Sequence, residues 1–239
     1  MCRADARWKS RLSPPCLAFS FLLALGWLPP SGTISAASRQ SLARRDLSET
    51  VPKPCLCIRL YNRADVSPQI LDRAAEEATR ILATAAVDIV WQQGPADSPE
   101  ARAFDQTGRG KGQHPKPDTR NYLVVNIRRG DPASAFPGAL GFALPDAQIG
   151  VHATIFYDRI ERLTQLVIIT VPKMLGHVMA HEIGHVLLGS TEHSSAGIMK
   201  ARWDRSDFQY SQAGYMDFTR EQRRVMRERA SVRVWREPE

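Results

Sequence analysis

Two histidines and a glutamate in residues 181–185 (HEIGH) have the spacing that a catalytic metal site requires. Residues four apart on a helix lie one turn apart on the same face, so His181 and His185 could direct ring nitrogens at one zinc ion, about 2.0–2.1 Å away. Glu182 lies about 100° around such a helix from His181, beside the metal but not bound to it. A carboxylate placed there can accept a proton from metal-bound water. The residues therefore predict a zinc site of helical imidazoles with a general base next to it.

The flanking residues favour a helix that ends just beyond the second histidine. Pro172 is suited to the first turn, and the helix is predicted to continue to about Leu188. Gly189 follows where a left-handed residue would end the helix. His193 comes next, and a histidine pair with a purely structural role would not need it. The context therefore favours a metal site over a structural pair.

The stretch 176–199 resembles the metzincin clan of zinc metallopeptidases. That clan combines a His-Glu-x-x-His helix with a turn glycine, a third histidine and a downstream methionine turn. The resemblance implies that His181, His185 and His193 bind one catalytic Zn²⁺ ion. It also implies that Glu182 is the general base of a peptide-hydrolysing enzyme.

Two further residues have structural roles in this resemblance: Gly189 at the turn and Met199 beneath the metal. The clan's usual spacing puts the glycine three residues after the second histidine and the third histidine three residues later. Both intervals are four residues in this chain, so one extra residue would lengthen the helix and one the turn. Glu192 and Asp204 are the alternative third ligands, and Glu221 is a more distant one.

Other side chains near the motif have weaker claims to a role. Tyr210 and Tyr215 follow the methionine and could supply a hydroxyl near the transition state. His177 precedes His181 by one turn, about 5–6 Å along the axis, so three such residues on a straight helix cannot converge on one ion. We therefore expect His177 to be buried, hydrogen-bonded or close to the ligands, and Trp203 to be a packing residue.

Strands and one helix precede the motif and must position it. Alternating or continuous apolar residues predict strands at 57–61, 88–92, 122–127 and 151–157. Helical spacing of apolar residues at 69–86 predicts a helix that starts at Ser67-Pro68, with Pro68 as its first residue. The Gly- and Pro-rich residues 94–120 and 130–150 are expected to be a long loop and an irregular rim. Thr219 and Gln222 predict a capping box for a last helix at about 220–230.

The predicted fold class is α+β, and the resemblance implies a single zincin- or metzincin-like domain. This domain would have a twisted mixed sheet of about four to five strands, a packing helix, an active-site helix, a methionine turn and a C-terminal helix. Residues 141–144 (GFAL) and 156–159 (FYDR) are also similar to segments of uncharacterised secreted bacterial proteins of this kind. That similarity implies no substrate.

The N-terminus has the features of a secretory signal peptide. Basic residues precede an apolar stretch at 16–28, which is shorter than the roughly 20 residues of a membrane-spanning helix. Small residues then predict cleavage after Ala37, and an uncleaved anchor is the alternative. The chain divides into a signal peptide at 1–37, a linker or short pro-segment at 38–54, a catalytic domain at 55–232 and a tail at 233–239. We therefore expect a secreted protein, extracellular or periplasmic, without an integral membrane span once the signal is removed.

The composition fits an ordinary globular protein: 239 residues, of which 43% are hydrophobic and 24% charged. The formal net charge is +7, but no five like charges occur in a row, so a nucleic-acid partner is not predicted. Cys55 and Cys57 would remain after signal removal, and one intervening residue makes a bridge between them strained. We expect buried or idle thiols, with an intermolecular bridge or a thiolate capping the metal as alternatives.

The expected function is that of a secreted zinc-dependent metallopeptidase acting on a peptide or protein substrate. An extended peptide could pair with the edge of strand 151–157 or with the rim at 141–144. One alternative is a non-hydrolytic zinc-binding interaction module on the same scaffold. Another is an envelope- or nucleic-acid-associated protein in which the histidines are incidental.

Overall fold

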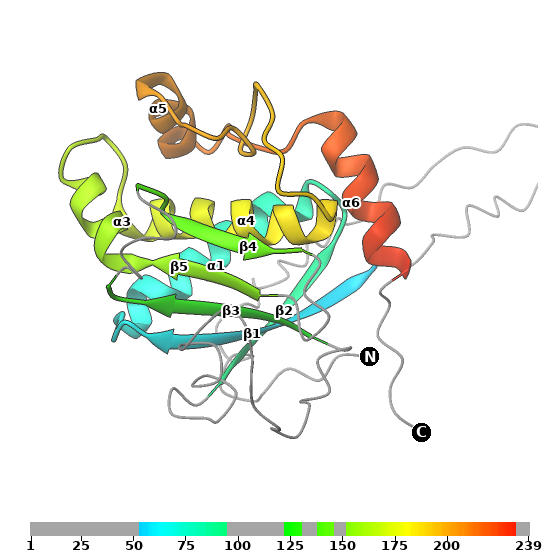
Figure 1. Ribbon diagram of the computed structural model, residues 1–239, viewed down its shortest axis with the longest axis horizontal. Helices are drawn as coiled ribbons and strands as arrows, with labels where there is room; N and C mark the ends of the chain where they lie inside the picture. Colours follow the sequence, from blue (N-terminus) through cyan, green and yellow to red (C-terminus); the bar gives the residue numbers. More distant parts are fainter. Residues whose placement is uncertain (1–52, 95–121, 131–137, 146–151, 233–239) are drawn as a thin grey trace, which may run out of the picture. The chain divides into compact units, whose positions relative to one another are not determined.

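The computed structural model describes residues 53–94, 122–130, 138–145 and 152–232. The expected signal peptide, the C-terminal tail, nearly all of the linker and most of the long loop lie outside these residues. The described elements are, in chain order, β1 (Cys55–Arg63), α1 (Pro68–Ala83), β2 (Asp88–Gln93), β3 (Leu123–Arg128), β4 (Gly141–Leu144), β5 (His152–Phe156), α3 (Tyr157–Thr164), α4 (Val171–Leu188), α5 (Arg205–Ala213) and α6 (Arg220–Val232). They form the predicted α+β fold (Figure 1).

The sheet has five strands in the order β2-β1-β3-β5-β4 and is mixed, as predicted. β1 runs parallel to both β2 and β3, and β3 runs parallel to β5. β4 alone is antiparallel, and it lies at the edge beside β5. The central strand β3 is buried along Leu123–Ile127, which accounts for its continuous apolar sequence.

Two expectations about the rim were wrong. Residues 141–144 form strand β4 and not an irregular segment, because they pair with β5 from Gly141 opposite Ile155 to Leu144 opposite His152. The predicted strand at 151–157 is β5, which lies between β3 and β4. Both of its edges are therefore occupied, and it cannot bind a peptide by strand addition. β4 lies next to β5 and, within the described residues, has one edge that pairs with no other strand.

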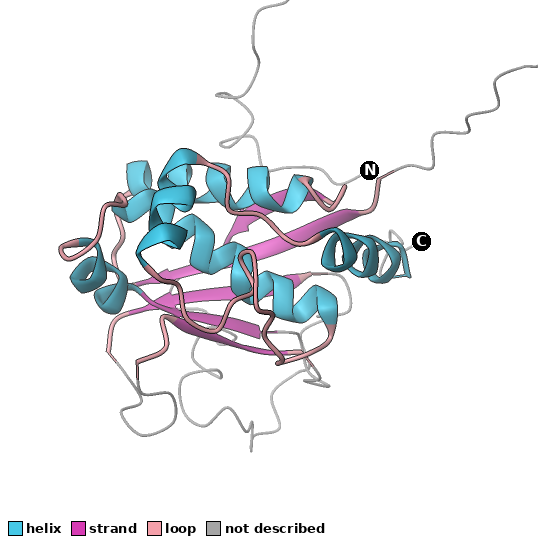
Figure 2. Cartoon of the chain, turned by 90° about the horizontal axis from the view of Figure 1, so that it is seen from above, coloured by secondary structure: helices cyan, strands magenta, loops and turns pink. Residues whose placement is uncertain are grey.

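Helices α1 and α4 lie side by side on one face of the sheet (Figures 1 and 2). α1 begins at Pro68, as the sequence predicts, and buries Leu71 and Leu82 among other apolar residues. The two helices come close at Gly176, where an added Cβ would lie 2.7 Å from the carbonyl oxygen of Ala74. This contact fixes α4 against a helix that is itself attached to the sheet.

α4 is buried on nearly all sides, because the sheet and α1 cover part of it and the segments after it cover the rest. It ends at Gly189 in the left-handed conformation, with φ 59° and ψ 37°, as predicted. The expected capping box also forms: the backbone NH of Thr219 donates to Gln222 Oε1 at 2.9 Å, and the NH of Gln222 donates to Thr219 Oγ1 at 3.3 Å. These two features fix where α4 stops and where α6 starts.

Helices α3 and α5 were not predicted.

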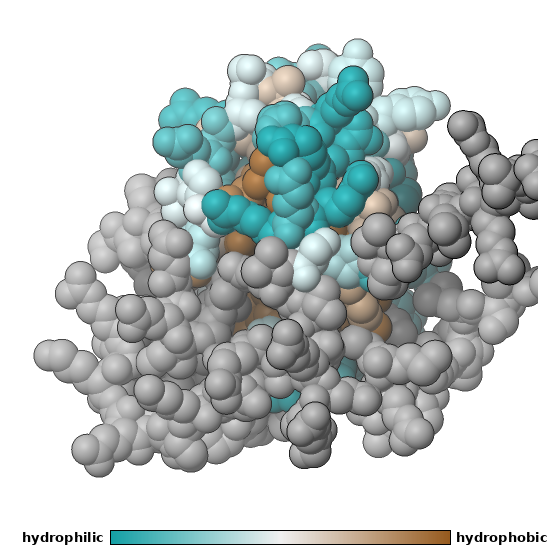
Figure 3. All heavy atoms as spheres, turned by 90° about the vertical axis from the view of Figure 1, so that its right-hand side faces the viewer, coloured by the Kyte–Doolittle hydropathy of each residue, from teal (hydrophilic) through white to brown (hydrophobic). Residues whose placement is uncertain are grey.

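α6 presents a strongly hydrophilic outer surface (Figure 3), on which Arg224 forms ion pairs with Glu221 and Glu228. β1 begins at Cys55, which is half-buried, and Cys57 is buried. Among the residues described, no helix combines the length and apolar character needed to span a membrane.

Candidate metal centre

Three histidines converge on one point at the surface of α4. His181 and His185 lie on successive turns, with their Nε2 atoms 3.1 Å apart. The ring of His193 lies 5.4 Å from that of His181 and 4.8 Å from that of His185, between centroids. One nitrogen from each ring falls within 4.8 Å of the others, and no other such cluster of His, Cys, Asp and Glu occurs in the described parts of the chain.

The turn after α4 brings His193 back to the helix in spite of the longer spacing. Gly189 ends the helix, and the backbone NH of Ser190 donates to the carbonyl oxygen of His185 at 3.2 Å. The Ser190 hydroxyl then accepts from the backbone NH of Glu192 at 3.0 Å. One extra residue thus belongs to the helix and one to the turn, and His193 reaches the same point.

Backbone carbonyls fix the orientation of both helical imidazoles. His181 Nδ1 lies 2.7 Å from the carbonyl oxygen of Ile198, and His185 Nδ1 lies 2.8 Å from that of Ser190. A carbonyl only accepts, so each Nδ1 must carry the hydrogen and each Nε2 must hold a lone pair. Two lone pairs at 3.1 Å repel each other unless a cation lies between them.

This donor set fits a catalytic zinc ion. Tetrahedral Zn–N bonds of about 2.0–2.1 Å put two ligand nitrogens about 3.3 Å apart, close to the observed 3.1 Å. Burial and the two neighbouring histidines lower the pKa of His181 to about 3, and burial lowers the pKa of His185. Both rings are therefore neutral near pH 7, as metal ligands must be. Three imidazoles leave one tetrahedral position open, which is typical of catalytic sites.

Glu182 lies between α4 and the start of β4. Its side chain is 5% exposed, and an added Cβ on Gly141 would lie 2.8 Å from Glu182 Oε1. Gly141 therefore leaves room for the carboxylate, which borders the cavity in front of the histidines. Burial raises the pKa of Glu182 to about 8, and a cation bound nearby would favour the ionised form.

Met199 packs against α4 at Gly184, next to His185 in the sequence. It is fully buried, and its Sδ would be 2.8 Å from a Cβ added to Gly184. Phe218 would be as close to that Cβ, at 2.7 Å, so the glycine of the HEIGH sequence makes room for both side chains. The backbone NH of Ser194 donates to the carbonyl oxygen of Met199 at 2.8 Å, which joins the turn after His193 to the segment that carries Met199.

The indole of Trp203 shares a carbonyl with the first histidine. Its Nε1 donates to the carbonyl oxygen of Ile198 at 3.1 Å, and that oxygen also accepts from His181. The Trp203 ring makes edge contacts with His181 at 5.8 Å and with His177 at 6.2 Å, between centroids. Trp203 is thus a packing residue, as expected, but its position beside the ligands was not predicted.

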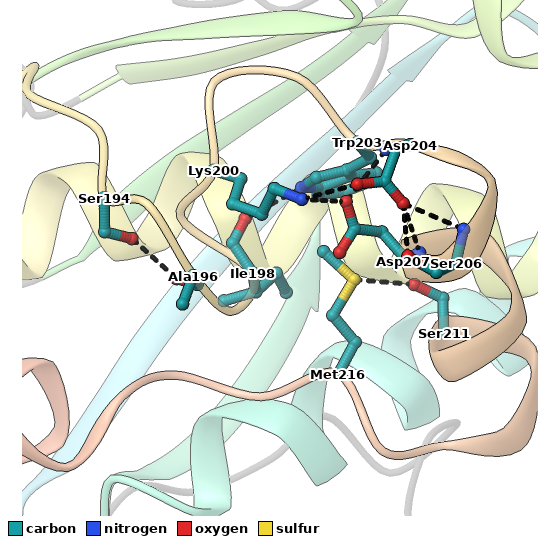
Figure 4. Close-up of polar contacts among 10 residues, drawn as sticks. All are labelled: Ser194, Ala196, Ile198, Lys200, Trp203, Asp204, Ser206, Asp207, Ser211 and Met216. Atoms are coloured by element: carbon teal, nitrogen blue, oxygen red, sulfur yellow. Dashed lines mark hydrogen bonds and ion pairs between the residues drawn. The ribbon is translucent and has the colours of Figure 1, made fainter.

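A small ionic network fastens the segment that carries this carbonyl (Figure 4). Lys200 Nζ contacts Asp204 at 3.0 Å and also contacts Asp207. Asp204 caps α5 by accepting from the backbone NH groups of Ser206 at 2.8 Å and Asp207 at 3.1 Å. The cap and the lysine together hold the start of α5 against the turn that contains Ile198.

The structure does not bring the remaining candidates to the histidines. Asp204 serves as the N-cap of α5, and Glu192 lies outside the cluster although it is next to His193. Tyr210 and Tyr215 are 58% and 76% exposed, and neither borders the cavity. Glu221 forms its ion pair with Arg224 on α6.

A cavity of about 1050 Å³ opens in front of the metal centre. Its walls come from segments that are distant in sequence: residues 138–143 with β4, one side of α3, the middle of α4 and residues 200–203. His177, by contrast, is fully buried beside α1, with Nδ1 2.9 Å from the carbonyl oxygen of Lys173. It is hydrogen-bonded as expected and lies outside the histidine cluster.

No protein-family model matches the sequence, and no curated protein matches it significantly. Among solved structures, the chain is similar to a zinc-dependent peptidase from Methanocorpusculum labreanum, with 14% identity, a TM-score of 0.46, and coverage of 71% of this chain and 99% of that one. It is also similar to archaemetzincin from Methanopyrus kandleri, with 18% identity, a TM-score of 0.44, and coverage of 76% and 99%.

Proposed function

We propose that this protein is a zinc metallopeptidase that hydrolyses peptide bonds in the cavity in front of its three histidines. The convergence of His181, His185 and His193 within 4.8 Å carries this proposal. Two of these rings have their coordinating nitrogens fixed by carbonyls, and a buried carboxylate lies beside them. This combination provides both a place for the metal and a group that can move a proton.

A zinc ion held by the three histidines would supply Lewis-acid chemistry, lowering the pKa of water and polarising a carbonyl oxygen. Glu182 follows His181 in the helix and borders the same cavity, so its carboxylate accepts a proton from the attacking water. It then delivers that proton to the amine that leaves. Its burial between α4 and Gly141 keeps it in one position through both transfers.

The peptide would bind along β4. This strand borders the cavity, lies at the edge of the sheet, and runs past Glu182 at Gly141. Backbone groups on its outer edge can pair with an extended peptide, which places a peptide bond over the histidines. Exported peptides or proteins would be the substrates if the signal peptide at 1–37 is removed as the sequence predicts.

Substitution of Glu182 by Gln tests this function. The amide cannot accept a proton, so kcat/KM for a generic peptide library should fall by at least about 100-fold, while zinc content is retained. Glu192→Gln is the matched control, because Glu192 is exposed and lies outside the histidine cluster. Turnover retained in Glu182→Gln would remove the general-base role. Zinc binding without cleavage by the unmodified protein would favour a non-hydrolytic module.

A further inference from the structure

Among the described residues, the charged side chains that border the cavity are strongly unbalanced in sign. Four of them are basic and one is acidic, and they are Arg159, Arg162, Lys200, Arg202 and Glu182. The basic residues come from two separate walls, α3 and the segment after Met199. The wall formed by residues 138–143 contributes no charged side chain. Glu182 is the group assigned to proton transfer, so no acidic side chain on the described walls remains to bind a basic substrate.

Arg162 and Lys200 have acidic partners among the described residues. Arg162 pairs with Asp158 on the same helix, with Nη2 3.0 Å from Oδ2. Lys200 is held between the carboxylates of Asp204 and Asp207. These two residues add less to the field of the cavity than their formal charges suggest.

Arg202 differs from these two. Its side chain is exposed and borders the cavity, and it forms no hydrogen bond or ion pair with any described residue. It directly precedes Trp203, whose indole is fixed to the carbonyl oxygen of Ile198. The backbone beneath Arg202 is thus held close to the metal centre while its guanidinium remains available to a ligand.

Arg159 lies on the wall formed by α3 and is nearly buried, at 9% exposed. Its Nη1 donates to the carbonyl oxygen of Ala139, and its guanidinium carbon lies 4.5 Å from the centre of the Phe156 ring. Burial and the positive charge of Arg162 lower its pKa. Even so, an arginine remains charged at neutral pH, so a fixed positive charge lies behind the segment that leads into β4.

We propose that the cavity selects peptides that carry a carboxylate close to the bond that is cut, and that Arg202 is the residue that determines this specificity. The inference rests on the proposed function and adds its substrate class. A planar guanidinium can bind a carboxylate through two parallel hydrogen bonds. The carboxylate can belong to an Asp or Glu side chain or to the C-terminus of the peptide.

Four matched peptides separate these two sources. They share one sequence, contain either Glu or Gln next to the cleavage position, and end in either a free acid or an amide. The full chain loaded with zinc should cleave the peptides with the relevant carboxylate about tenfold or more faster, measured as kcat/KM. If the Glu peptides are cleaved faster than the Gln peptides, the site recognises a side-chain carboxylate. If the free-acid peptides are cleaved faster than the amides, the site recognises the C-terminus of the peptide. Added salt should reduce either effect, because Arg202 is exposed.

Substitution of Arg202 by Gln should remove most of the preference and leave cleavage of the Gln-amide peptide nearly unchanged. Arg202→Lys should keep part of the preference for peptides with a carboxylate. The positive charge remains in this variant, but the two parallel hydrogen bonds of a guanidinium are lost. Arg205→Gln is the matched control, since Arg205 is an exposed arginine three residues later that does not border the cavity. Thermal melting should be the same for all three variants and the unmodified chain.

Equal cleavage of all four peptides would overturn the inference and leave the peptidase function intact. A preference that persists in Arg202→Gln would also overturn it. If no peptide is cleaved, the proposed function fails, and binding of the four labelled peptides to the zinc-loaded chain by fluorescence anisotropy decides the inference. Tighter binding of the carboxylate peptides that is lost in Arg202→Gln would support it, and equal binding would refute it.

Discussion

The two ring nitrogens of each helical histidine have separate tasks. Nδ1 of His181 and of His185 is bound to a carbonyl from a turn, so the position of Nε2 depends on those turns. Ile198 and Ser190, which supply the carbonyls, lie on either side of His193 in the sequence. The loop that presents the third imidazole thus also orients the first two.

Loss of the third imidazole tests the arrangement at the scale of single residues. His193→Ala should lower the zinc content of the purified protein, measured by metal analysis, because two imidazoles hold zinc less tightly than three. Glu192→Ala is the neighbouring control and should retain zinc. Unchanged stoichiometry in His193→Ala together with a loss in Glu192→Ala would move the third ligand to Glu192.

His177 predicts a pH dependence of stability. Burial lowers its pKa, although the carbonyl oxygen of Lys173 and the carboxylate of Glu77 act in the opposite sense, and Arg80 and the Lys173 ammonium add to the lowering. Its Nε2 is buried without a hydrogen-bond partner among the described residues, and Trp203 lies against the ring. The folded protein therefore keeps this ring neutral at pH values where the unfolded chain is protonated.

The sign follows from linkage, because the unfolded state binds the extra proton. Stability from this group is fully present above the unfolded pKa of about 6.5 and is lost as the pH falls toward the lower folded value, by at most about 1.4 kcal/mol per pH unit. His177→Phe should remove this part of the slope. Urea unfolding of both zinc-free proteins between about pH 5 and pH 8 measures it. Parallel curves would show that His177 does not contribute.

At the scale of elements, the end of α4 determines where the site closes. Gly189 has φ 59°, and Gly214, which ends α5, has φ 83°. Alanine at either position should destabilise the fold by about 1 kcal/mol, because a Cβ is unfavourable in the left-handed region. A Cβ on Gly189 would also meet the end of the exposed Arg229 side chain, which can move into solvent.

The two glycine variants should differ in zinc binding. Gly189 precedes Ser190, whose carbonyl oxygen orients His185. Strain at Gly189 should therefore lower the affinity for zinc by about tenfold. Gly214 has nothing within 4 Å of an added Cβ and does not border the cavity. Calorimetric zinc titration of Gly189→Ala and Gly214→Ala should therefore separate the two. Equal affinities would mean that the turn does not depend on this conformation.

Long elements with a clear period could be predicted from the sequence. The sequence predicted α1, α4, α6 and the four strands β1, β2, β3 and β5 with ends within a few residues of those observed. β4 could not be predicted, because it has four residues, begins with a glycine and forms by pairing with β5. α3 and α5 are short, with eight and nine residues, and depend on tertiary contacts. The Asp204–Asp207 capping box and the helix-ending Gly214 were local signals that could have revealed α5.

The candidate site likewise has a part that could be predicted from the sequence and a part that could not. Contacts within one helix or one turn follow from spacing, so His181, Glu182 and His185 could be selected as a group, with Gly189 as the helix end. The cavity walls could not be predicted, because Arg159, Gly141 and Arg202 come together only when α3, β4 and the segment after Met199 meet around α4. A sequence pattern does not contain these long-range contacts.

At the scale of the whole molecule, the candidate metal centre joins helix α4 to the segments that follow it in the chain. α4 packs directly on α1, β4 and β5, and the turn at 189–193 and the segment at 198–207 follow it in the chain. Hydrogen bonds from His181 and His185 connect these segments to the helix. An ion held by three histidines would connect the segments more strongly, so metal binding and folding should be linked.

Zinc should therefore raise the thermal stability of the full chain in a concentration-dependent way. A ligand that binds only the folded state at 100 times its dissociation constant adds about 2.7 kcal/mol to the free energy of unfolding. Calorimetric melting in chelator and in increasing zinc measures this shift, which should be much smaller in His193→Ala. Glu182→Gln should retain the full shift, because Glu182 is not a ligand in this arrangement. A shift that survives in His193→Ala would place the stabilising ion elsewhere and separate the histidine cluster from the metal.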